Sequence, residues 1–253
     1  MLALHSIGLD AHSFDALREA VGPDWRITSF DQRGHGAQVN RPATSLEQYV
    51  DDAALALAEC SDGPVHLLGH SMGGAVAALL AARTACGSPG RIATLTLISS
   101  PSRGMLGFTE RAAAVRADGV RAAVAPTMFR WFGEEGAALD NAPQSYARST
   151  LNAMQSEGFA GAWEALAQFP GYDDIADLLP PTLCITAADD LSTPPHAMQP
   201  IVEAFKKAGR ADNVAFTTLA SGGHMAPLFA APELVGALRV HWLAHTVQPS
   251  SKH

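Results

Sequence analysis

Short apolar segments alternate along the chain with longer helical ones. The short segments are rich in Leu, Ile or other branched residues and are bounded by Gly, Pro or Asp, which predicts buried strands at residues 2–5, 25–30, 65–69, 92–98, 182–186 and 214–219. Residues 45–59 repeat their apolar positions at intervals of three and four, the period of a helix packed on one face. Further helices are predicted at residues 73–85, 195–208 and 232–244.

Alternating strands and helices predict an α/β fold, with a doubly wound, mostly parallel sheet covered by helices on both faces. The alternation breaks between residues 101 and 180, where no strand pattern occurs and a helical pattern covers residues 109–124. We expect this stretch to be a helical lid inserted between two strands. The predicted domains are a core of residues 1–100 and 181–253 and a lid of residues 101–180.

Composition indicates a globular protein and excludes several classes. Of 253 residues, 47% are hydrophobic and only 17% charged, which is unlike a disordered or fibrous chain. The formal net charge of −8 argues against a nucleic-acid partner, because such proteins carry a basic face. No apolar segment reaches the roughly 18 residues of a membrane span. The first residues lack the pattern of a signal peptide, so we expect a cytoplasmic protein without a membrane partner.

The residues that bind metals or nucleotides in other proteins are scattered here. Cys60, Cys86 and Cys184 are far apart, so three free thiols are predicted. No Cys-x-x-Cys pair occurs, and the first strand is not followed by the glycine pattern of a dinucleotide site. No metal and no cofactor are therefore expected.

The strongest chemical signal is residues 69–73, Gly-His-Ser-Met-Gly, between a predicted strand and a predicted helix. A G-x-S-x-G turn bends so sharply that the residues two before and two after the serine must be small. Such a turn lifts the Ser71 hydroxyl away from the sheet and places it at the start of the next helix, where backbone N–H groups stabilise an oxyanion. A nucleophilic serine is therefore predicted at position 71.

In four motifs the chain resembles the α/β-hydrolase family, over nearly its whole length. Residues 5–8 (His-Ser-Ile-Gly) are similar to the oxyanion loop, with serine in place of the usual glycine, as in the branch that hydrolyses dienelactones and enol-lactones. Residues 31–36 (Asp-Gln-Arg-Gly-His-Gly) match a second loop, and residues 69–73 match the nucleophile turn. Residues 190–194 (Asp-Leu-Ser-Thr-Pro) and 223–224 (Gly-His) match the loops that carry the acid and the base.

The resemblance implies a catalytic triad. Ser71 would attack an acyl carbon, His224 would take and return the proton, and Asp190 would orient the imidazole. Asp189 is the alternative acid, but the proline four residues after position 190 favours Asp190. The backbone N–H groups of residues 7 and 72, Ile7 and Met72, would form the oxyanion hole.

The resemblance also sets expectations for the sheet. In the family the lid follows the sixth strand, and an antiparallel lead-in precedes the oxyanion loop. Because this chain reaches its oxyanion loop almost at once, the family's first two strands are expected to be missing. Residues 25–30 should then form a sheet edge, covered by a loop, by Arg26 or by the chain end, or paired with a second subunit. A monomer or a homodimer is expected.

Within the predicted lid, three residues are the candidates for substrate binding. Trp131 and Trp163 would suit a small apolar acyl or alcohol group, although such aromatics also serve as ordinary lid core. Arg130 lies beside aromatic residues and is the candidate to bind a carboxylate, whereas the other lid arginines are expected to face solvent.

The pattern as a whole predicts a serine hydrolase that cleaves a small-molecule carboxylic ester or lactone through an acyl-enzyme intermediate. Two alternatives stay open: a carbon–carbon bond hydrolase of the same fold, and a non-catalytic ligand-binding receptor that retains the triad. Fold likeness alone does not select a substrate.

Overall fold

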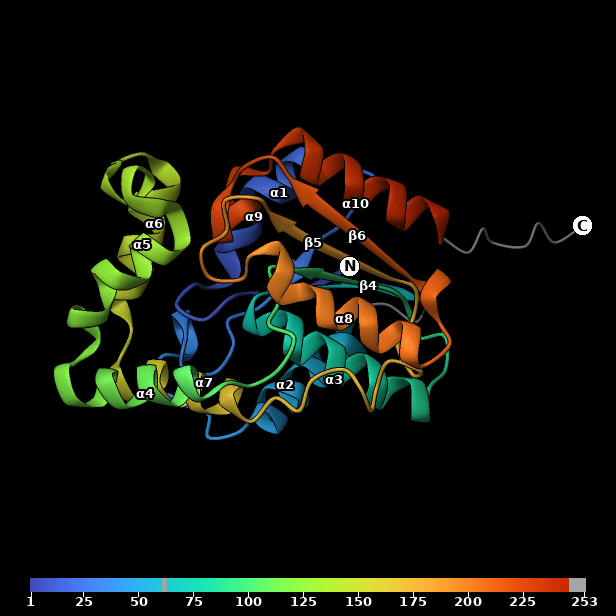
Figure 1. Ribbon diagram of the computed structural model, residues 1–253, viewed down its shortest axis with the longest axis horizontal. Coiled ribbons are helices and arrows are strands. Elements are labelled where there is room, and N and C mark those ends of the chain that lie inside the picture. The colour runs from blue at the N-terminus through green and yellow to red at the C-terminus, as the bar shows by residue number, and fades with distance from the viewer. Residues whose placement is uncertain (61–62, 246–253) are drawn as a thin grey trace, which may run out of the picture.

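A parallel sheet of six strands forms the centre of the computed structural model, which describes residues 1–60 and 63–245 (Figure 1). The predicted core segment of residues 181–253 therefore extends beyond the described residues. Along the sheet the order is β2-β1-β3-β4-β5-β6, and all neighbouring strands are parallel. The strands are β1 (Leu2–Leu4), β2 (Thr28–Ser29), β3 (Val65–His70), β4 (Ile92–Ile98), β5 (Thr182–Ala187) and β6 (Val214–Leu219).

Helices cover both faces of this sheet (Figure 1), which confirms the predicted doubly wound α/β class. On one face α1 and α10 bury an apolar cluster that includes Leu17 and Trp242. On the other face α2, α3 and α8 bury a larger cluster that includes Tyr49, Val76 and Phe205. The flanking helices are α1 (Asp15–Val21), α2 (Leu46–Cys60), α3 (Met72–Gly87), α8 (Pro195–Lys207), α9 (Ala226–Phe229) and α10 (Pro232–Ala244).

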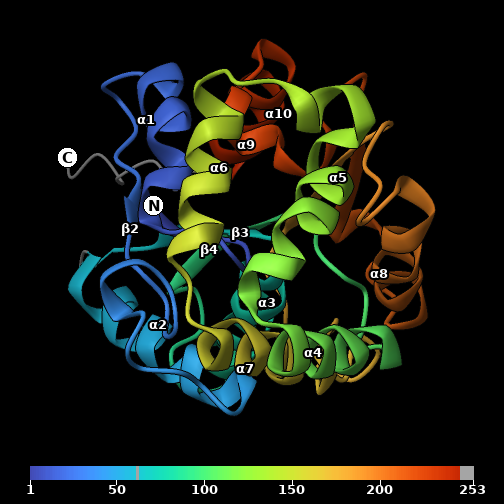
Figure 2. The ribbon, with the colours of Figure 1, turned by 90° about the vertical axis from the view of Figure 1, so that its left-hand side faces the viewer.

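Helices α4 to α7 join β4 to β5 and stand over the carboxyl ends of the strands (Figure 2). The prediction of a single helix over residues 109–124 is wrong. One helix ends before Gly119 and another begins after it, because the φ of 80° at Gly119 is not helical and favours glycine. In the described part of the chain, no helix is both long and apolar enough to cross a membrane. The four helices are α4 (Leu106–Asp118), α5 (Val120–Ala138), α6 (Ala142–Ala153) and α7 (Ser156–Ala167).

β2 lies at one edge of the sheet, as the sequence predicts, but it contains only Thr28–Ser29 instead of residues 25–30. Because β2 is two residues long, it forms only two residue pairs with its partner β1. Next to this edge, Nε of Arg18 in α1 donates to the Ile27 carbonyl at 3.1 Å. Cover by a loop, by Arg26 or by the chain end stays a prediction. The expectation of a monomer or a homodimer stays a prediction.

The turn from β3 to α3 has no room for side chains at its glycines. A Cβ atom on Gly73 would overlap the backbone carbonyl oxygen of Leu4 in β1, and one on Gly69 would overlap the backbone of Gly73. Between these glycines, Ser71 has a φ of 54° and a ψ of −118°, a conformation that costs a non-glycine residue about 1–3 kcal/mol. The close approach of α3 to the sheet holds Ser71 in this strained conformation.

Replacing Gly73 with Ala should therefore destabilise the protein, whereas the same change at Gly87 should not. At residue 73 the added methyl group meets backbone, which cannot move aside cheaply, so we expect a loss of about 1–3 kcal/mol or more in the free energy of unfolding. Gly87, at the other end of the same helix, has open space around its position. Urea unfolding of both variants checks this, and equal stabilities would contradict the packing argument.

Candidate active site

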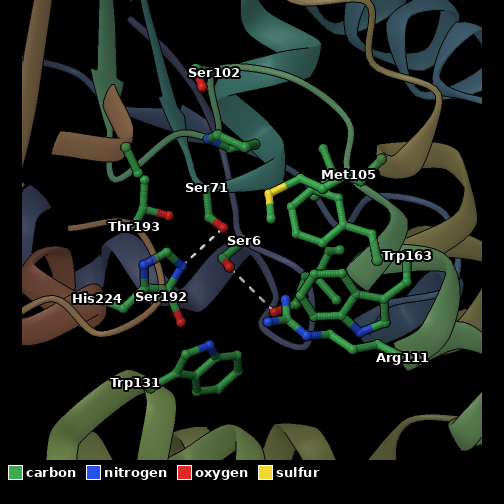
Figure 3. Close-up of a pocket in the computed structure, with 15 residues that line it drawn as sticks. Ser6, Ser71, Ser102, Met105, Arg111, Trp131, Trp163, Ser192, Thr193 and His224 are labelled. Atoms are coloured by element: carbon green, nitrogen blue, oxygen red, sulfur yellow. Dashed lines mark hydrogen bonds between the residues drawn. The ribbon is translucent and has the colours of Figure 1, made fainter. Parts of the chain in front are cut away.

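A pocket of about 60 Å³ lies at the carboxyl ends of the strands, beneath the α4–α7 insertion (Figure 3). Its walls come from the loops after β1, β4, β5 and β6, from the β3–α3 turn, and from helices α4, α5, α7 and α8. Within residues 1–60 and 63–245, no three His, Cys, Asp or Glu side chains gather closely enough to hold a metal ion. Lining residues include Ser6, Ile7, Ser71, Trp131, Trp163 and His224.

Ser71 is the residue between β3 and α3, and its side chain points into this pocket (Figure 3). Its backbone N–H donates to the Ile98 carbonyl at 2.8 Å, which ties the turn to β4. Its Oγ lies 3.0 Å from Nε2 of His224. The predicted nucleophile and base are thus within hydrogen-bond distance.

His224 lies on a short 3₁₀ turn, η4 (Gly223–Met225), and its Nδ1 is 3.0 Å from Oδ2 of Asp190. Both side chains are almost fully buried. Burial alone would raise the pKa of Asp190, but the attraction and hydrogen bond of His224 and the N–H of Thr193 outweigh it and lower that pKa to about 2. A carboxylate that stays ionised keeps the proton of a neutral imidazole on Nδ1 and leaves Nε2 free to accept one from Ser71.

Asp189 occupies a different place from Asp190, although the two are adjacent in sequence. Its carboxylate is exposed and accepts from the backbone N–H groups of Gly223 at 2.9 Å and Gly222 at 3.3 Å. Asp190 itself accepts from the N–H of Thr193 at 2.8 Å, in addition to its contact with the imidazole. Of the two carboxylates, the structure brings Asp190 to His224 and uses Asp189 to hold the loop that carries it.

Of the two residues predicted for the oxyanion hole, Met72 follows Ser71 in the chain and Ile7 lines the same pocket as Ser71. Met72 is the first residue of α3, so its N–H belongs to the first turn, whose donors have no carbonyl partner within the helix. Ile7 lines the pocket from the loop after β1. This loop is shaped by the buried His5, whose Nδ1 donates to the Ser6 carbonyl at 2.8 Å, while its Nε2 accepts from the N–H of Gln32 at 2.9 Å. Burial lowers the pKa of His5 to about 4, which keeps it neutral.

His70 has a contact with the base loop that the sequence did not reveal. Its Nε2 donates to the backbone carbonyl of His224 at 2.7 Å. The pKa of His70 is lowered to about 3, mainly by burial and next by repulsion from the neighbouring His224, so the ring is neutral at physiological pH. No sequence signal pairs residue 70 with residue 224, because this contact depends on the packing of β3 against the loop after β6.

Of the three predicted substrate-binding residues, Trp131 and Trp163 line the pocket and Arg130 does not. Successive residues on a helix point about 100° apart, so Arg130 faces away when Trp131 faces in. The arginine that reaches this pocket is Arg111 of α4, contrary to the expectation that the lid arginines other than Arg130 face solvent (Figure 3). Which side of α4 faces inward depends on how the helix packs on α7, and the sequence does not state that packing.

Known proteins resemble the chain both in sequence and in fold. The model of the family described as "Alpha/beta hydrolase family" matches residues 1–238. The 3-oxoadipate enol-lactonase 1 of Acinetobacter baylyi is 28% identical over 191 residues, which cover 74% of this chain and 69% of that protein. The pimeloyl-[acyl-carrier protein] methyl ester esterase of Neisseria meningitidis is 35% identical over 101 residues, 40% of this chain and 36% of the esterase.

Solved structures agree on the fold. A thermophilic esterase from Thermogutta terrifontis, in a malate-bound form, is 26% identical with a TM-score of 0.82, over 97% of this chain and 90% of the esterase. The enol-lactonase from Burkholderia xenovorans LB400 is 20% identical with a TM-score of 0.81, over 96% and 90% of the two chains. With the family match spanning nearly the whole sequence, the chain belongs to the alpha/beta hydrolase family.

Proposed function

We propose that the protein is a serine hydrolase that cleaves a carboxylic ester or lactone. The proposal rests on one observation: Ser71, His224 and Asp190 are hydrogen-bonded in series, and Ser71 faces the pocket. A hydroxyl, an imidazole and a buried carboxylate in this order are the parts of a nucleophile activated by a general base.

The proposed reaction uses only these side chains, backbone N–H groups and water. Ser71 Oγ attacks the acyl carbon as its proton passes to Nε2 of His224, and the N–H groups of Ile7 and Met72 stabilise the oxyanion that forms. The imidazolium then protonates the leaving alcohol oxygen, and the acyl-enzyme remains. Water, activated by the same imidazole, releases the acid and restores the serine, while Asp190 stabilises the imidazolium.

The choice of an ester or lactone rests on the pocket and on the relatives. Trp131 and Trp163 give the pocket an aromatic wall next to Ser71, which suits a small acyl or alcohol group. Among the relatives that match the chain are an enol-lactonase and a methyl ester esterase. Both bond types react through the same acyl-enzyme, so one site serves either; in a lactone the leaving alcohol stays attached to the acyl group.

Ser71→Ala is expected to lower kcat toward p-nitrophenyl acetate by at least about a thousandfold, because triad residues act as a unit. The variant should keep the wild-type circular dichroism spectrum and should no longer react with a fluorophosphonate probe. Ser88→Ala, at the exposed far end of α3, is the matched control and should keep both activity and labelling. Activity above about a tenth of wild type in Ser71→Ala would refute the nucleophile assignment.

Asp190→Asn and Asp189→Asn separate the two adjacent carboxylates. An amide at residue 190 can donate to Nδ1 and so favour the wrong imidazole tautomer, which should lower kcat by about 10⁴-fold. An amide at residue 189 still offers a carbonyl oxygen to the two N–H groups of the base loop, so we expect less than about a tenfold loss. Steady-state kinetics on both variants decides, and a larger loss at residue 189 would reverse the assignment.

A further inference from the structure

Arg111 brings a positive charge into the pocket, and the proposed reaction does not use this charge. Its side chain extends from α4 toward the loop of Ser6 and Ile7, beside Trp163 (Figure 3). The guanidinium carbon lies 4.9 Å from the centre of the Trp163 ring and 5.5 Å from that of Phe108. The two aromatic rings hold the cation at the wall of the pocket and leave its N–H donors available.

Among the described residues Arg111 forms neither an ion pair nor a hydrogen bond. Burial lowers its pKa, which expresses the cost of removing the charge from water. Arg116, five residues further along α4, shows the opposite arrangement: it is paired with Glu157 and Glu164 of α7. Arg116 thus has two carboxylate partners between α4 and α7, whereas Arg111 has none among the described residues.

A second cavity, of about 260 Å³, shares Arg111 and Trp163 with the catalytic pocket and contains Arg130. Arg130 donates to the Thr127 hydroxyl at 2.8 Å and has no acidic partner in the described residues. Burial, together with the nearby Arg111, lowers the pKa of Arg130 to about 10. Asp118 also lines this cavity, but it is exposed and pairs with neither arginine.

Arg111 and Arg130 are half-buried cations that face adjoining cavities, and within residues 1–60 and 63–245 no carboxylate pairs with either. Their charges repel each other and are poorly solvated. Such charges are stable when an anion joins them, because buried charges in proteins are normally paired. A guanidinium fixed against aromatic rings offers parallel N–H donors that match the two oxygens of a carboxylate. The missing counter-charge is therefore best supplied by the ligand of this site.

We propose that the substrate is an anionic ester or lactone, whose carboxylate binds Arg111 while its acyl carbon lies at Ser71. Arg130 adds a second positive charge on the far side of Arg111 and increases the affinity for the anion. This inference rests on the proposed serine hydrolase function and adds the class of its substrate. Arg111 is a specificity residue in this account, because it contacts the part of the substrate that does not react.

Two isosteric esters test the proposal: mono-p-nitrophenyl glutarate and p-nitrophenyl valerate, which differ in a terminal carboxylate or methyl group. Wild type should show the higher kcat/KM with the glutarate ester, after subtraction of its spontaneous hydrolysis. In Arg111→Gln the ratio of kcat/KM between the two esters should fall about 10- to 100-fold, mainly through KM, because a charge-assisted contact is lost. Arg111→Lys should recover part of that ratio.

Arg121→Gln is the matched control, because Arg121 is an exposed arginine of the same insertion that lines neither cavity. It should leave the ratio at the wild-type value, and Arg130→Gln should lower it less than Arg111→Gln does. Calorimetric titration with glutarate and with neutral glutaramide gives a readout without turnover. Glutarate should bind the wild type more tightly than glutaramide does, and this preference should be lost in Arg111→Gln.

The outcomes separate this proposal from the proposed function. If Ser71 is labelled and the valerate ester is cleaved, but the ratio is the same in wild type and Arg111→Gln, the carboxylate proposal is overturned and the hydrolase function stands. If neither ester is cleaved and Ser71 is not labelled, the hydrolase function fails, while the titrations with glutarate still decide whether Arg111 binds carboxylates.

Discussion

The close approach of α3 to β1 and β3 is the constraint on which the whole site depends. Glycine at residues 69 and 73 lets the backbone of the turn pass the neighbouring strands at distances that a Cβ atom would forbid. This tight turn forces Ser71 into a strained conformation, and α3 begins at the next residue. The same contact brings the start of α3 against the backbone of Leu4 and His5, so the serine and the loop after β1 meet at one point.

The other half of the site is a short loop that several groups hold in place. His224 is fixed through its ring by Asp190, through its carbonyl by His70, and through the preceding N–H groups by Asp189. The α4–α7 insertion also packs on this loop, because a Cβ on Gly223 would overlap the carbonyl oxygen of Trp131. The insertion thus contributes to the position of the imidazole as well as to the walls of the pocket.

Local patterns predicted the mostly parallel sheet, and three side chains singled out from the sequence, Ser71, His224 and Asp190, lie together in the structure. Contacts between distant helices escaped prediction. The spacing of the glycines in residues 69–73 pointed to Ser71, and the resemblance of residues 190–194 to the family pattern pointed to Asp190. Arg111 could not be found from the sequence, because its inward orientation depends on the packing of α4 on α7 and on the break at Gly119. The preference for Arg130 came from its aromatic neighbours in sequence, but adjacent positions on a helix face different ways.

Acid quenching during turnover of p-nitrophenyl acetate, followed by mass spectrometry of the digested protein, tests the central claim most directly. The account predicts an acetyl group on the peptide that contains Ser71, together with an initial burst of nitrophenol of about one equivalent per chain when deacylation is the slower step. An acetyl group on another residue of a fully active protein would contradict the account, because hydrolysis would then use a different nucleophile.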